Sequence, residues 1–139
     1  MFETEAAEAC PIVSGGPADV LVHFMSLAFS TRYGSRHALS RLALLLRGEY
    51  GIDLDPLTTF ADRDVEDEAD ARELERVWQP AAPLAACVRG VLAAMRSGDA
   101  RMAELTEESP DLEARLADLL RMVEWAEERG ARVRLTFEL

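Results

Sequence analysis

The hydrophobic period of the chain changes at Gly130, and this change limits the possible folds more than any other feature. Before it, apolar residues follow at helical spacing: Leu112, Leu116, Leu119, Leu120, Val123 and Ala126. Ser109, Pro110 and Asp111 supply a cap, a proline and an acid, which are typical of a helix start. After Gly130, residues 131–139 alternate between apolar and polar side chains, which predicts a half-buried strand.

A single strand leaves its backbone N–H and C=O groups without partners, so the strand at residues 131–139 needs a second strand. No other segment alternates as cleanly. One candidate is the short stretch at residues 12–13 in the N-terminal arm. The other is the same strand of a second copy, paired antiparallel around a twofold axis. Both alternatives stay open, and we favour the homodimer.

Helical spacing of apolar residues predicts further helices at 18–33, 36–50, 64–79, 84–97 and 99–107. The first is apolar around most of its circumference, as expected for a central or interface helix. Gly34 would end it and Ser35 would cap the second helix, while residues 51–62 form a connecting loop. We therefore predict a mostly α fold, a compact bundle of about five to six helices with one C-terminal strand at residues 131–139.

Length and composition indicate a globular chain with one domain. The chain has 139 residues, of which 49% are hydrophobic and 29% are charged. Gly15, Gly16 and Pro17 interrupt the chain before the first predicted helix. We therefore divide it into an N-terminal arm, residues 1–16, and a single helical domain, residues 17–139.

Charge and cysteine content indicate where the protein acts. The net charge of −11 at pH 7 argues against binding to nucleic acid or to an anionic membrane, because both require a positive surface. No apolar run reaches the about 18 residues of a membrane-spanning helix. Cys10 and Cys87 lack the CxxC spacing, which favours reduced thiols. We expect an acidic, cytoplasmic protein that binds neither nucleic acid nor membrane.

The first candidate binding site is a basic turn that contains Arg32, Tyr33, Arg36 and His37. The chain has no Lys or Arg before Arg32, whereas residues 53–75 carry ten acids and two Arg. If Ser35 caps the second helix, unpaired backbone N–H groups would lie beside two Arg, which suits a phosphate or a carboxylate. The alternative is that these Arg only pair with acidic segments.

A polar line follows one face of the first predicted helix and consists of Asp19, His23, Ser26, Ser30 and Tyr33. This line could border a ligand pocket in which Asp19 orients His23 as a general base. The alternative is an ordinary face exposed to solvent, which is the usual place of polar residues on a helix.

Motifs of metal and cofactor chemistry are missing or incomplete. Asp62, Asp64, Glu66 and Glu73 match four positions of a calcium loop, but Asp67 stands where that loop needs Gly. The sequence contains no ExxH pair and no HExxH, CxxC, GxGxxG or GxSxG motif. We therefore expect no metal, no cofactor and no catalytic residue.

These observations favour a non-catalytic, homodimeric helical binding protein. Its ligand would be another protein or a small anion, held near Arg32, Tyr33, Arg36, His37 and His23. One alternative is a small enzyme with His23 as general base in a pocket of the bundle. Another is an acidic partner of a basic protein, with residues 62–75 as the contact face.

Overall fold

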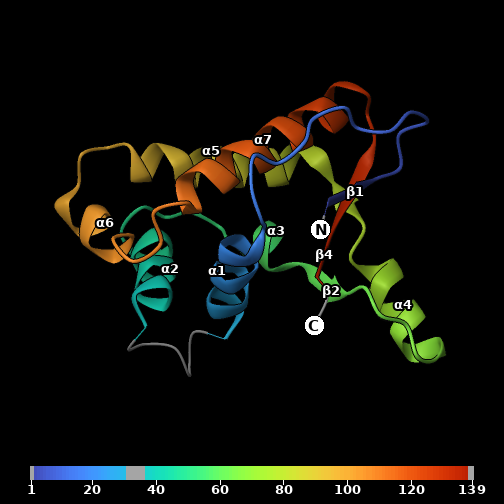
Figure 1. Cartoon of the computed structure of the whole chain (residues 1–139), viewed down its shortest axis with the longest axis horizontal. Helices are drawn as coiled ribbons and strands as arrows, with labels where there is room; N and C mark the ends of the chain where they lie inside the picture. The colour runs from blue at the N-terminus through green and yellow to red at the C-terminus, as the bar shows by residue number, and fades with distance from the viewer. Residues whose placement is uncertain (1, 31–36, 138–139) are drawn as a thin grey trace.

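The computed structural model describes residues 2–30 and 37–137, which form seven helices and a small four-stranded sheet (Figure 1). The helices are α1 (Asp19–Phe29), α2 (Ala38–Gly48), α3 (Asp55–Thr58), α4 (Glu68–Arg76), α5 (Ala81–Met95), α6 (Ala100–Leu105) and α7 (Leu112–Glu128). The strands are β1 (Phe2–Thr4), β2 (Phe60–Asp62), β3 (Gln79–Pro80) and β4 (Arg132–Phe137). The mostly α fold is confirmed. The prediction of a bundle with one strand is wrong, because three more short strands pair with β4.

The two longest helices, α5 and α7, lie side by side and run in opposite directions (Figure 1). Their facing stripes are fully buried at Val88 and Val91 on α5 and at Leu116 and Val123 on α7. Helix α7 begins at Leu112, whose N–H donates to the carbonyl oxygen of Ser109. Burial of the predicted leucine stripe thus drives the packing of this pair.

Helices α1 and α2 pack against each other and complete the core. Phe24 of α1 and Leu42 of α2 are fully buried. Helix α2 starts later than predicted, because His37 is its cap: the Nδ1 atom accepts a hydrogen bond from the N–H of Leu39 at 3.1 Å. His37 takes the capping position for which Ser35 was predicted, and Ser35 itself lies outside the described ranges.

The segment predicted as a loop at residues 51–62 contains helix α3 and strand β2. Leu54 and Leu57 are buried there. Helix α4 is shorter than predicted and begins after Asp67, whose side chain accepts a hydrogen bond from the N–H of Asp70 at 2.9 Å. None of its residues is buried, and it projects from the body of the molecule (Figure 1).

Strand β4 lies in the middle of the sheet and has partners on both sides. Strand β1 pairs antiparallel with it and places Phe2 opposite Leu135. On the other side, β2 runs parallel and places Phe60 opposite Leu135, and β3 pairs antiparallel near Val133. The arm thus contributes β1 and not the predicted stretch at residues 12–13. Because both sides of β4 are paired within the chain, the predicted pairing of β4 with its copy in a second chain no longer supports a dimer.

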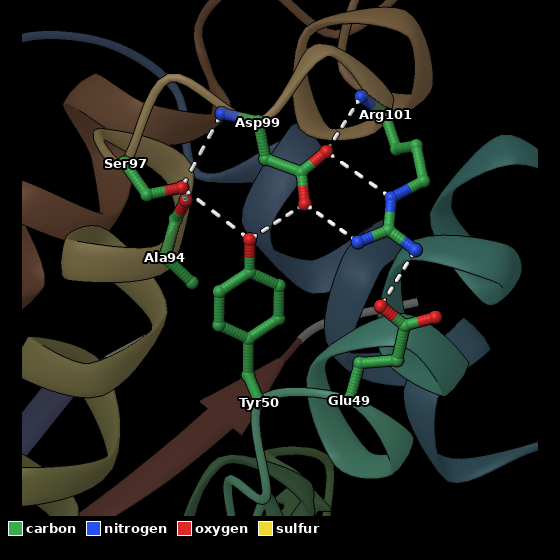
Figure 2. A network of polar contacts seen from close by, with 6 residues as sticks. All are labelled: Glu49, Tyr50, Ala94, Ser97, Asp99 and Arg101. Atoms are coloured by element: carbon green, nitrogen blue, oxygen red, sulfur yellow. Dashed lines mark hydrogen bonds and ion pairs between the residues drawn. The ribbon is translucent and has the colours of Figure 1, made fainter.

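A network of polar contacts joins the end of α2 to the turn before α6, as Figure 2 shows. The Tyr50 hydroxyl donates to Asp99 at 2.7 Å, and Asp99 accepts the N–H of Arg101 at 2.9 Å, so Asp99 caps α6. Arg101 also pairs with Glu49 at 2.6 Å. Hydrogen bonds from Arg101 and Tyr50 hold the pKa of Asp99 well below its usual range.

Candidate functional site

The structure brings together two of the residues predicted to bind a ligand. His23 lies on α1 and His37 caps α2, and both are exposed. Their ring centroids are 4.9 Å apart and their planes are tilted by 56°. The other predicted ligand-binding residues, Arg32, Tyr33 and Arg36, lie outside the described residues, in the segment that joins the two helices.

A hollow of about 500 Å³ lies between the start of α1 and the end of β4. It is lined by Ala18, Asp19, Val22, His23, Arg63, Thr136 and Phe137. One face of α1 supplies Asp19, Val22 and His23, since residues three and four positions apart share a helix face. The hollow therefore adjoins the histidine pair.

Arg63 reaches this hollow because of the parallel pairing of β2 with β4. It follows β2 directly in the chain, and its backbone N–H donates to the carbonyl oxygen of Phe137 at 2.7 Å. This bond extends the strand pairing by one residue and holds Arg63 beside the end of β4. A guanidinium and an imidazole then line one wall of the same hollow, and both can donate hydrogen bonds to oxygen atoms of an anion.

The polar line on α1 is exposed at Asp19, His23 and Ser26 and half-buried at Ser30. Asp19 and His23 both line the hollow, but within residues 2–30 and 37–137 no hydrogen bond joins them. The general-base hypothesis required Asp19 to orient His23. The described geometry lacks that contact, and the line resembles an ordinary solvent-exposed face.

The acidic segment before α4 uses its carboxylates on its own backbone. Asp62 accepts a hydrogen bond from the N–H of Asp64 at 2.9 Å, and Asp70 accepts one from Glu66 at 3.1 Å. In the described ranges, no three His, Cys, Asp or Glu side chains converge as metal ligands. These acids thus form the turn and cap from which α4 starts.

An aromatic cluster next to the hollow was missed by sequence reasoning. Phe60 of β2 contacts Phe29 of α1 and Phe137 of β4 edge-on, with centroid distances of 5.8 Å and 5.6 Å. Phe29 is 69% exposed. Phe60 and Arg63 belong to a segment whose three-residue strand is too short to show a hydrophobic period, so only the parallel pairing brings them here.

We found no match to the chain among protein-family models, curated proteins or solved structures. Within residues 2–30 and 37–137, every helix is too short or too polar to cross a bilayer.

Proposed function

We propose that the protein is a non-catalytic binding protein that holds a small anion in the hollow between α1 and β4. The observation that carries this proposal is the presence of His23 and Arg63 in one hollow, with His37 against the ring of His23. The segment between these histidines carries Arg32 and Arg36 in the sequence. Guanidinium and imidazole groups are the usual partners of phosphate and carboxylate oxygens.

The test is isothermal titration calorimetry with inorganic phosphate. Arg63→Gln and the double variant Arg32→Ala/Arg36→Ala should each weaken binding by about tenfold, because a hydrogen bond to a charged group contributes about 1.5–3 kcal/mol. Arg89→Gln is the matched control, since Arg89 is an exposed guanidinium on α5 that pairs with Glu124 and Glu127. If both sets of variants bind phosphate as wild type does, the proposal is wrong.

We also propose that the protein is a cytoplasmic homodimer. Phe29 is exposed beside Phe60, and within residues 2–30 and 37–137 strand β2 pairs only with β4. An apolar side chain and a strand edge without a described partner therefore lie together. The two described cysteines are free thiols, in agreement with a reducing compartment. Light scattering should give twice the monomer mass, and Phe29→Ser should shift the protein to the monomer. A monomeric wild-type protein would disprove the dimer.

A second candidate function is an acidic partner for a basic protein. It is favoured by α4, which projects from the body and buries none of its residues. Poly-arginine should bind in low salt and dissociate as ionic strength rises. Reversing Glu68 and Asp70 to Arg should weaken that binding, whereas the same change at the exposed Glu107 and Glu108 should not. If the two charge reversals weaken binding equally, poly-arginine responds only to the net charge, and the proposed role of α4 is wrong.

A further inference from the structure

A second cavity, of about 190 Å³, lies between β1, the start of α1 and α7. It is lined by Phe2, Ser14, Ala18, Leu21, Arg115, Leu119 and Met122. Most of these side chains are apolar, and Arg115 is the charged one among them. Of the residues that line the anion-binding hollow, only Ala18 also lines this cavity, so the two are separate candidate sites.

Arg115 is nearly buried, and its hydrogen-bonding capacity is not used. Its side chain is 13% exposed, and its Nε atom lies 3.2 Å from Oδ2 of Asp118. The Nε atom is nevertheless buried without a hydrogen bond, because the ion pair is poorly aligned. No other hydrogen bond from this guanidinium is present in the described part of the chain. A buried donor without an acceptor is unfavourable and points to a partner.

Asp118 alone cannot satisfy the hydrogen-bond donors of Arg115, because its carboxylate oxygens already accept hydrogen bonds from other residues. Its Oδ2 accepts the N–H of Gly15 at 3.0 Å and lies 3.3 Å from the Ser14 hydroxyl. Its Oδ1 accepts a hydrogen bond from Arg121. Two guanidinium groups therefore face one carboxylate, which leaves one positive charge at the edge of the cavity. A single extra positive charge suits a monoanion.

Two glycines make room for this guanidinium. A Cβ on Gly16 would lie 2.0 Å from Nη1 of Arg115, and one on Gly15 would lie 3.2 Å from Nη2. Neither glycine has a positive φ, so the backbone here does not itself require glycine. The pair of glycines therefore matters for the close approach of Arg115 to the backbone, which keeps the guanidinium at the cavity.

We propose that this cavity binds a monocarboxylate with a short apolar tail, such as hexanoate or benzoate. The carboxylate would accept hydrogen bonds from the planar guanidinium of Arg115, and the tail would lie among Phe2, Leu21, Leu119 and Met122. The size fits, because an apolar cavity of about 150 Å³ holds a benzene ring. For ligands of this size we expect a dissociation constant on the order of 1 mM.

The test follows the methyl signal of Met122 by NMR during titration with hexanoate, benzoate and the neutral analogue hexanol. Both acids should bind saturably and hexanol about tenfold more weakly, because it lacks the charge that Arg115 recognises. Arg115→Gln should weaken the binding of both acids by about tenfold or more. Gly16→Ala should also weaken the binding of both acids although Arg115 keeps its charge, because the added Cβ displaces the guanidinium. Ala18→Leu should block all three ligands by filling the cavity.

Arg89→Gln serves as the control for loss of a surface charge, and it should leave binding of the acids unchanged. Arg63→Gln should also have no effect here, which separates this cavity from the phosphate site proposed above. The proposal is wrong if neither acid shifts the Met122 signal, or if hexanol binds as tightly as hexanoate. It is equally wrong if Arg115→Gln and Gly16→Ala both keep the affinity of wild type.

Discussion

Asp118→Asn should destabilise the protein, because Asp118 joins Ser14 and Gly15 to α7. The side chain of Asp118 is 8% exposed. It accepts hydrogen bonds from Ser14, Gly15 and Arg121 and forms an ion pair with Arg115. Asn keeps the size and one acceptor oxygen but removes the charge. The substitution leaves Arg115 nearly buried without its counter-ion.

The magnitude follows from the exposure of each partner. In the ion pair with Asp118, the side chain of Arg121 is 61% exposed, and exposed ion pairs contribute about 0–1 kcal/mol to the free energy of unfolding. The pair with Arg115 is 13% and 8% exposed, and removing one partner of a buried pair costs about 3–5 kcal/mol. The ion pair with Arg115 is not a hydrogen bond, so we take the lower end and expect a loss of about 3 kcal/mol.

Urea unfolding followed by circular dichroism measures this loss, and its pH dependence provides a second check. The N–H of Gly15, followed by Arg121 and Arg115, holds the pKa of Asp118 below its usual range. A carboxyl group with a lowered folded-state pKa stabilises the protein above its ordinary pKa, near 4. That contribution disappears as the pH falls through the folded-state pKa. The difference between wild type and Asp118→Asn should therefore shrink in acid.

Glu107→Gln is the matched control, because Glu107 is an exposed acid in the turn after α6. Adding Arg115→Met to Asp118→Asn should restore part of the loss, because the unpaired guanidinium is then gone. Equal unfolding midpoints for Asp118→Asn and Glu107→Gln at pH 7 would refute the reasoning.

Three further predictions concern the core, the polar network and the thiols. Phe24→Ala should cost about 3–5 kcal/mol in a urea titration, because Phe24 is fully buried, whereas Leu44→Ala, at a position 47% exposed, should change stability little. Tyr50→Phe and Asp99→Ala should each lower the thermal midpoint in calorimetry, with the larger effect at Asp99, which also caps α6. Burial raises the pKa of Cys87 to about 12, so a thiol reagent at pH 8 should modify the half-buried Cys10 first and reach Cys87 only on unfolding. Equal modification rates for the two cysteines in the folded protein would contradict that order.

The long helices could be predicted from the sequence because their apolar stripes repeat over several turns. The stripe from Leu112 to Ala126 is buried almost throughout in α7. Strand β4 was predicted for the same reason, since Val133 and Leu135 alternate with polar residues and are fully buried. Strands β1, β2 and β3 have two or three residues each, so they show no period and depend on pairing with β4.

The candidate sites were predicted less completely, because they depend on contacts between distant segments. His23 and His37 were chosen from the sequence and do lie together. Arg63 and Arg115 gave no local signal, since each reaches its cavity through tertiary packing. At Gly15 and Gly16 the sequence indicates only a break in the chain, because the close approach of these glycines to Arg115 is a tertiary contact.

The central position of β4 has a consequence for biosynthesis. Glu3 of β1 meets Arg134 of β4 across 131 positions of the sequence. During translation β1, β2 and β3 therefore have no strand partner until residues 132–137 have emerged from the ribosome. The packing of α1 against α2, by contrast, needs no later segment. Closing so long a loop is slow, so sheet formation should be the late, rate-limiting stage of folding. Until then a chaperone could bind β1, β2 and β3 in competition with their pairing to β4.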